Sequence, residues 1–162
     1  MSTRPALLVA VVTACGLLTG CWYNRSAAAP AELSFVIHPT ALAFITPTGE
    51  SSSVPAGPLA PGSRVLGSDD LLIGGVVAGH DNEVCTVSFE LNVLCDDMLS
   101  FSGTGDVHAT WTFQWPTDGS AGPATFDGVV AGGTGAYRGA VGAFHAVALP
   151  NRDVQITGSF SR

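Results

Sequence analysis

Apolar and polar residues alternate with a period of two along most of the chain, which predicts β-strands. The clearest segment is 107–115, where the odd positions are Val, Ala, Trp, Phe and Trp and the even positions are His, Thr, Thr and Gln. Successive side chains of a strand point to opposite faces, so this segment has an apolar aromatic face and a polar face. No long helical period appears.

Similar patterns predict seven to nine short strands separated by turns rich in glycine or proline. The predicted segments are 33–45 (interrupted at His38-Pro39), 64–66, 71–78, 84–89, 93–101, 107–115, 125–131, 141–149 and 154–160. Asp69-Asp70 and His80-Asp81 fall in predicted turns, and residues 46–63 form a proline-rich loop. Such a chain favours a closed barrel or a sandwich, and periodicity alone does not separate the two.

The glycine-rich stretch 132–142, GGTGAYRGAVG, lies between two of these strands. A dinucleotide-binding loop would need glycine at Arg138 and a helix afterwards, whereas a strand pattern follows, so nucleotide binding is disfavoured. The stretch resembles the late GGTG-x-[YF]-x-x-A-x-G element of the allene oxide cyclase and dirigent barrels. The segments 67–72, 84–87 and 94–95 resemble other parts of this family in the expected order, including the paired cysteine strands of its bacterial members.

This resemblance implies an all-β fold, a small closed antiparallel β-barrel of about eight strands with a mainly apolar lumen. Known activities of the family are cyclisation of unsaturated fatty-acid derivatives, guided coupling of phenoxy radicals and, in bacterial relatives, cycloadditions in polyketide biosynthesis. The family's catalytic residues are present only in part. The first strand lacks the glutamate and amide of plant allene oxide cyclases, and Ala136 stands where dirigent proteins often have an aspartate.

The composition limits the partners of the protein. The 162 residues predict one domain, the formal net charge is −7, and the six arginines are scattered in a chain without lysine. An acidic chain without a basic patch is not expected to bind nucleic acid or anionic lipid.

The amino terminus resembles a bacterial export signal. Arg4 precedes an apolar segment at 6–18 that is short for a membrane span, and the sequence Leu18-Thr19-Gly20-Cys21 resembles a lipobox, whose cysteine is lipidated before cleavage. We expect a signal peptide at 1–20, a tether at 21–31 and a barrel domain at 32–162, with Cys21 anchoring an envelope lipoprotein. A plain secretory peptide cleaved near residues 27–29 and a downstream start codon are the alternatives.

Export would place the remaining cysteines in an oxidising compartment. Cys85 and Cys95 are ten residues apart and would face each other across a hairpin near Glu90, so we expect a disulfide between them. Two buried free thiols are the alternative. Neither cysteine has a nearby histidine at a ligand spacing, so no metal site is predicted.

Aromatic residues are the candidates for binding a small hydrophobic molecule. Trp111, Phe113, Phe126 and Phe144 would face strands rich in glycine and alanine and so line an apolar pocket, although ordinary core packing explains each ring equally simply. His145 shares its parity with apolar residues of 141–149, so we expect it to be buried beside them as a further substrate-binding candidate.

The catalytic candidates are Asp70, Tyr137 and Arg138. The dirigent resemblance implies an acid role for Asp70, with Asp69 second, whereas a turn aspartate that bonds its own backbone is the structural alternative. Tyr137 would donate a hydrogen bond to an oxyanion or plug the barrel. Arg138 would orient a carboxylate or an enolate, or pair with an aspartate such as Asp106 or Asp127.

Together these features predict a cyclase without a cofactor that folds an unsaturated hydrophobic substrate in the lumen. The reaction would be a cycloaddition or a related ring closure of the kind used in polyketide biosynthesis, where positioning alone supplies about 7–11 kcal/mol. A non-catalytic envelope lipoprotein that binds a hydrophobic small molecule is the alternative, and a barrel with a filled interior is a third. A homo-oligomer is compatible with either function.

Overall fold

The computed structural model describes residues 31–55, 59–115 and 123–161. The predicted signal peptide, Cys21 and all of the tether except residue 31 lie outside these residues. No helix in the described part of the chain is long and apolar enough to cross a membrane.

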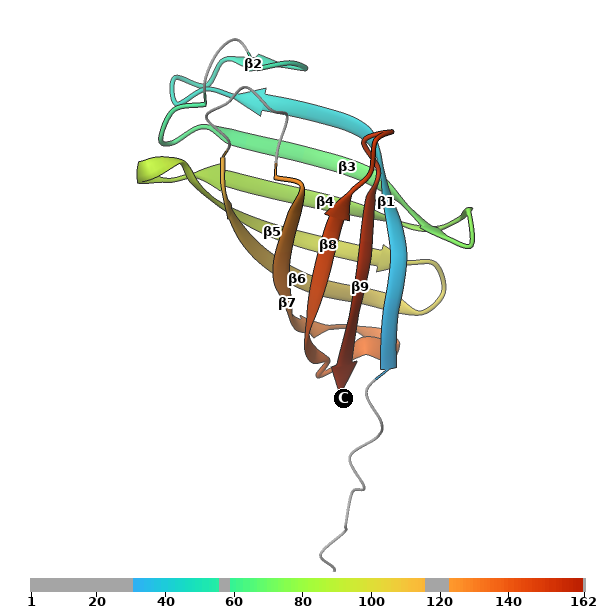
Figure 1. Cartoon of the computed structure of the whole chain (residues 1–162). Coiled ribbons are helices and arrows are strands. Elements are labelled where there is room, and N and C mark those ends of the chain that lie inside the picture. Colours follow the sequence, from blue (N-terminus) through green and yellow to red (C-terminus); the bar gives the residue numbers. More distant parts are fainter. Residues whose placement is uncertain (1–30, 56–58, 116–122, 162) are drawn as a thin grey trace, which may run out of the picture.

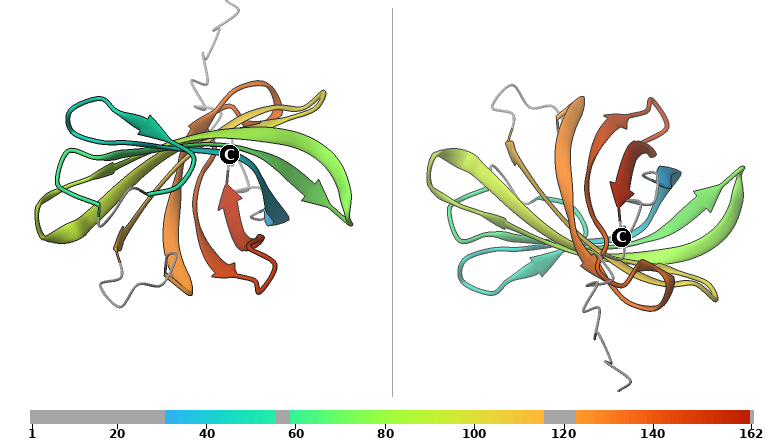
Figure 2. Two further views of the ribbon diagram at one scale, coloured as in Figure 1. Left: turned by 90° about the horizontal axis from the view of Figure 1, so that it is seen from above. Right: turned by 90° about the horizontal axis from the view of Figure 1, so that it is seen from below.

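Eight long strands form a closed antiparallel barrel, which confirms the predicted fold class (Figure 1). Neighbouring strands follow the order β1-β3-β4-β5-β6-β7-β8-β9, and β9 pairs back with β1 to close the sheet. The short β2 pairs only with the end of β1. The bounds are β1 Ala31–Ile45, β2 Ser51–Ser52, β3 Arg64–Ile73, β4 Val76–Val87, β5 Asn92–Phe101, β6 Gly105–Gln114, β7 Thr125–Gly133, β8 Val141–Ala148 and β9 Val154–Ser161. Figure 2 shows these strands from above and below.

The first strand is one continuous strand, and it has an irregularity beside the interruption at His38-Pro39. Its pairing with β3 shifts register between Pro39 and Ala41, while β1 continues as one strand to Ile45. Proline lacks an N–H to donate to the ladder, so a bulge at this position accommodates it.

Strict alternation on β5 shows how the strands build the core. Val93, Cys95, Asp97, Leu99 and Phe101 are buried in the lumen, and the residues between them are partly or fully exposed. One carboxyl group therefore belongs to the core in the same way as the valines and leucines around it.

Two predicted turns are wrong. Asp69-Asp70 lies inside the continuous strand β3, and the chain reverses instead at Gly74-Gly75, whose φ angles are 60° and 81°. Glycine adopts such positive φ angles without the steric cost that other residues meet. His80-Asp81 likewise lies inside β4, so both pairs contribute one side chain to each face of the barrel.

The glycine-rich stretch is a tight crossing between β7 and β8, as predicted. Its short 3-10 helix, Gly135–Tyr137, packs against the turn that connects β5 and β6. Gly135 has a φ of 53°, and a Cβ atom there would lie 2.4 Å from the carbonyl oxygen of Thr104. Glycine is therefore required at this position both for its conformation and for the close approach.

Candidate functional site

Four carboxyl groups face the lumen from three neighbouring strands, β3, β4 and β5. They belong to Asp69, Asp81, Glu83 and Asp97, which we call the acidic wall. The register places Asp69 opposite Asp81 and Glu83 opposite Asp97. Asp69, Asp81 and Asp97 are 6%, 1% and 2% exposed, so water does not solvate these groups as it would on a surface.

Burial raises the pKa values along the acidic wall. It raises the pKa of Asp97 to about 9, and repulsion from Asp81 and Glu83 adds to the effect. The pKa of Glu83 rises to about 8 and that of Asp81 to about 7, again chiefly through burial. A carboxyl group that is buried without a cation favours its neutral form. Asp97 and Glu83 therefore carry protons at neutral pH and are able to act as proton donors.

Several oxygens of the acidic wall lack hydrogen-bond partners. Both Oδ atoms of Asp97 and Oδ1 of Asp81 are buried without a hydrogen bond of good geometry, although the backbone N–H of Met98 lowers the pKa of Asp97. In contrast, the backbone N–H of Thr40 donates to Oδ1 of Asp69 over 3.1 Å. Unpartnered buried polar atoms destabilise a fold, and in native proteins they often mark functional sites.

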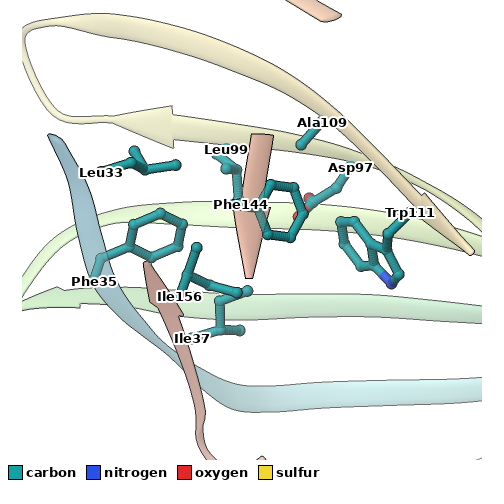
Figure 3. A pocket seen from close by; sticks show the side chains of 9 residues that line it. All are labelled: Leu33, Phe35, Ile37, Asp97, Leu99, Ala109, Trp111, Phe144 and Ile156. Atoms are coloured by element: carbon teal, nitrogen blue, oxygen red, sulfur yellow. The ribbon is translucent and has the colours of Figure 1, made fainter. Parts of the chain in front are cut away.

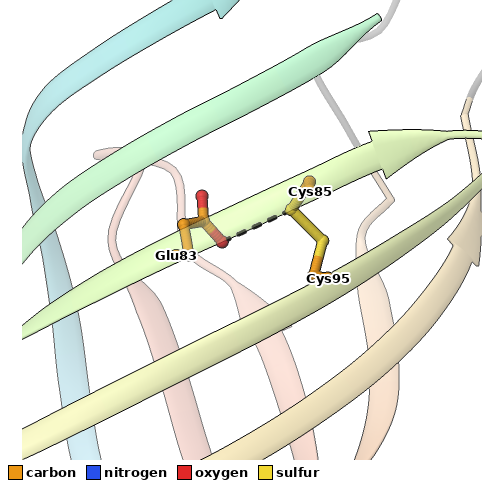
Figure 4. The surroundings of a disulfide bond; sticks show 3 residues. All are labelled: Glu83, Cys85 and Cys95. Atoms are coloured by element: carbon orange, nitrogen blue, oxygen red, sulfur yellow. Dashed lines mark hydrogen bonds between the residues drawn. A yellow bond between two sulfur atoms is a disulfide. The ribbon is translucent and has the colours of Figure 1, made fainter. Parts of the chain in front are cut away.

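Glu83 is held in a space that glycine provides. A Cβ atom on Gly67, the opposite residue of β3, would lie 2.5 Å from Cγ of Glu83. On its other side, Oε2 of Glu83 lies 3.6 Å from Sγ of Cys85 (Figure 4). Cys85 forms a disulfide with Cys95, so this sulfur has no hydrogen and the donor must be the protonated carboxyl group.

The predicted disulfide between Cys85 and Cys95 is present, and the two residues face each other across the β4–β5 hairpin. Both sulfurs and a carboxylate oxygen of Glu83 lie within 4.8 Å of one another. Sulfurs joined in a disulfide are not thiolates, and zinc requires thiolates, so this group does not form a metal site in the oxidised protein.

Asp97 borders a small cavity in the lumen (Figure 3). The other eight lining side chains are apolar and come from β1, β5, β6, β8 and β9, with Trp111 and Phe144 among them. The cavity holds about 10 Å³, which is room for about one water molecule. Ligand sites usually measure at least about 300 Å³, so a substrate must displace side chains to reach Asp97.

The four predicted aromatic residues gather around Trp111, beside this cavity. The Trp111 ring stacks on Phe126 at 5.5 Å between centroids and meets the edge of Phe144 at 6.0 Å. Phe113 lies 6.2 Å from Phe126 and continues the group toward the barrel end where β6 stops and β7 starts. Trp111 and Phe144 are buried, whereas Phe113 and Phe126 are half-buried. The four aromatic rings therefore form a continuous row from the barrel end to the cavity beside the acidic wall.

Tyr137 plugs the other end of the barrel. Its ring lies 5.6 Å from Phe101 and 5.7 Å from Phe160, and it is half-buried between β5 and β9. Arg138, the next residue, is exposed, and no ion pair among the described residues includes it. The structure thus places neither candidate beside the acidic wall. Of the two suggested partners of Arg138, Asp127 pairs with His145 and Asp106 accepts a hydrogen bond from Thr134.

Asp70 and His145 lie on the outer surface. Asp70 points away from the lumen, and its Oδ1 atom lies 2.8 Å from Nδ1 of His80. The expectation that His145 is buried is wrong, because its side chain is 50% exposed. Both faces of β8 carry apolar residues, and the lumen takes the face with Phe144 and Ala146. Of the two adjacent aspartates, the second choice, Asp69, faces the lumen.

Sequence reasoning missed Asp81, Glu83 and Asp97, although a signal was present. Asp81 and Glu83 have the parity of Cys85, and Asp97 has the parity of Cys95. Paired cysteines of neighbouring strands lie on one face, so these three carboxyl groups had to share that face with the disulfide.

Comparison with known proteins finds similar structures but no matching sequence or family model. No protein-family model matches the chain, and no curated protein matches its sequence. A pyocyanin demethylase structure matches with a TM-score of 0.60 and 18% identity, over 80% of this chain and 99% of that one. A pterocarpan synthase dirigent protein matches with a TM-score of 0.59 and 17% identity, over 82% of this chain and 83% of that one. The chain therefore has a barrel of the dirigent type at the level of the fold.

Proposed function

We propose that the protein is a catalyst without a cofactor that acts on an unsaturated, hydrophobic small molecule in the barrel lumen. The substrate lies between the aromatic group around Trp111 and the acidic wall, and ring closure or a related isomerisation is assisted by a proton from Asp97. One observation carries this proposal. Asp97 is 2% exposed in an apolar cavity, with both carboxyl oxygens unpartnered.

The chemistry follows from a protonated carboxyl group in a site that bulk water does not reach. Asp97 has a pKa of about 9 and keeps its proton at neutral pH. Donation to a carbonyl oxygen of the substrate would make the conjugated system more electrophilic, and the proton would return to Asp97 when the ring has closed. The product would then be an isomer of the substrate, and the enzyme would end in its starting protonation state.

The aromatic group supplies the binding surface and the route. Phe113 and Phe126 are half-buried at the barrel end, and Trp111 separates them from the cavity beside Asp97. A planar substrate would replace these ring–ring contacts with its own, so binding requires Trp111 to move. The two structural neighbours support a small-molecule role for such barrels, because they are a pyocyanin demethylase and a pterocarpan synthase dirigent protein.

The proposed place of action is the bacterial cell envelope, with the chain exported and attached through Cys21. The disulfide between Cys85 and Cys95 supports an oxidising compartment. Mass spectrometry of the protein from its own membranes tests the anchor. A diacylglycerol adduct on an amino-terminal Cys21 supports it, and a mature protein that begins after Cys21 contradicts it.

The catalytic proposal is tested with a panel of hydrophobic linear polyenes that each carry one ketone. Conversion is followed by loss of polyene absorbance and by a product of unchanged mass with a different retention time. Asp97→Asn removes the acidic proton and should lower the rate by about a hundredfold or more. Asp96→Asn is the matched control, because Asp96 is the adjacent residue, faces outward and is 61% exposed.

Three outcomes contradict the proposal. Equal rates for Asp97→Asn and the native protein exclude Asp97 as the proton donor. Equal losses for Asp97→Asn and Asp96→Asn point to a general structural effect. Recovery of bound polyene without conversion excludes catalysis on the tested substrates and supports the non-catalytic binding function instead.

A further inference from the structure

The lumen holds buried carboxyl oxygens that have no hydrogen-bond partner among the described residues. Oδ1 and Oδ2 of Asp97 and Oδ1 of Asp81 are buried and have no partner, and Asp97 borders the apolar cavity. The two residues are 2% and 1% exposed, so bulk water does not meet this need. An occupant that brings N–H donors would satisfy oxygens that the folded chain leaves unsatisfied.

The chain places few cations near these oxygens, and among the described residues the charge of the neighbouring His80 lowers the pKa of Asp81. The chain contains no lysine, and its described arginines, Arg64, Arg138 and Arg152, are exposed. Each of the four histidines lies near an aspartate outside the acidic wall. When its carboxyl groups ionise, the acidic wall carries negative charge that an occupant of positive charge would balance.

We propose that the lumen also binds a second class of molecule, which carries a basic nitrogen and binds in its protonated form with its N–H groups on Asp97 and Asp81. This inference goes beyond the proposed function, because a cation held on ionised Asp97 competes with a substrate that takes the proton of Asp97. A protonated amine has up to three N–H donors, and the wall offers three unpartnered oxygens. The rings of Trp111 and Phe144 line the same cavity and favour a cation over a neutral group of the same shape.

The proton balance of this binding step is fixed by the carboxyl groups. A protonated amine binds to ionised Asp97, whose proton leaves for solvent, whereas a neutral amine takes that proton onto its nitrogen. Glu83 and Asp81 on β4 and Asp69 on β3 are the titratable groups that raise the pKa of Asp97. The cavity residues from β1, β6, β8 and β9 are apolar. Because the pKa of Asp97 is about 9, binding of a cation should strengthen as the pH rises toward that value.

Three probes of one shape test the charge preference: 1-naphthylmethylamine, its neutral isostere 1-ethylnaphthalene, and 1-naphthoic acid. Titration calorimetry at pH 7 should rank the amine first by about tenfold or more and the acid last. Between pH 6 and 8 the affinity for the amine should rise by up to about tenfold per pH unit, while that for 1-ethylnaphthalene stays constant. The measured enthalpy for the amine should also depend on the buffer, because a proton is released.

Variants separate this inference from the proposed function. Asp97→Asn should remove the preference for the amine and leave the affinity for 1-ethylnaphthalene within about twofold, whereas Asp96→Asn should retain both. If Asp97→Asn does not fold, Asp81→Asn provides the same measurement at the third unpartnered oxygen. Equal binding of amine and isostere, or preference for the acid, overturns the inference and leaves a hydrophobic lumen in place. Failure of all three probes to bind overturns the inference, and the polyene assay then decides the proposed function separately.

Discussion

Two sets of carboxyl groups in this protein meet opposite surroundings. Four aspartates outside the acidic wall each lie within 4 Å of a histidine ring: Asp70 near His80, Asp96 near His108, Asp127 near His145 and Asp153 near His38. The four members of the acidic wall face the lumen without any such partner. Members of the two sets are even adjacent in sequence, as in Asp69-Asp70 and Asp96-Asp97, so strand alternation alone separates them.

One member of each set illustrates opposite effects on acidity. A hydrogen bond with His38 lowers the pKa of Asp153, so folding favours its ionised form. Burial raises the pKa of Asp97 to about 9, so folding favours its neutral form. The same side chain is a stable anion in one place and a proton donor in the other. The contrast indicates that the acidic wall is maintained at a cost to stability, which is typical of functional sites.

Asp97→Asn is expected to have the largest effect on the free energy of unfolding and its pH dependence. The folded pKa of Asp97 lies above the unfolded value of 3.8, so its contribution to stability is fully present below about pH 4 and is lost as the pH rises toward 9. The native protein should therefore lose stability between pH 5 and 9, by up to about 1.4 kcal/mol per pH unit for this group. Asp97→Asn should be more stable than the native protein at pH 8, by about 1–4 kcal/mol.

Urea unfolding at pH 5 and pH 8 provides the measurement. Asp96→Asn serves as the control, since it removes a carboxylate from the exposed side of the same strand. A pH slope that Asp97→Asn leaves unchanged would show that Asp97 is ionised in the folded protein, and the contrast between the two sets would then fail.

Gly67→Ala should have the next largest effect. The new Cβ atom would lie 2.5 Å from Cγ and 2.7 Å from Oε1 of Glu83, so Glu83 must leave its place beside the disulfide. Overpacking of this kind costs about 1–3 kcal/mol. The double variant Gly67→Ala/Glu83→Ala removes the clash and should recover most of the loss. If the double variant is as unstable as the sum of the two single variants, Gly67 does not serve to house Glu83.

The barrel was predictable from the sequence. Predicting the acidic wall, however, depends on placing the turns between the strands correctly. Alternation in 107–115 and the glycine-rich stretch give strands and a tight crossing whatever the tertiary context. Asp69-Asp70 and His80-Asp81 look like turns by composition, and Gly74-Gly75 between them was overlooked. Placing the reversal at the two glycines turns both acidic pairs into strand residues, and alternation then directs Asp69 and Asp81 inward.

Other features depend on register, which the sequence does not display. The stacking of Trp111 on Phe126 joins residues of two strands across a connection, and the stagger of the barrel determines their distance. His145 was expected in the core because both faces of its strand are apolar, and only closure of the barrel selects the face with Phe144. The size of the cavity is likewise a result of packing among five strands.

Asp127→Asn should have the smallest effect and completes the contrast. Asp127 is 83% exposed, and its Oδ1 atom lies 2.8 Å from Nδ1 of His145, directly across the β7–β8 pair. Exposed ion pairs contribute about 0–1 kcal/mol, because solvent screens them and ordering the side chains costs entropy. Urea unfolding at pH 6 should show a loss below about 0.5 kcal/mol, which 1 M salt should reduce further. A loss of unfolding free energy as large as the gain expected for Asp97→Asn would contradict this prediction. The aspartate–histidine pairs would then be required for the stability of the sheet.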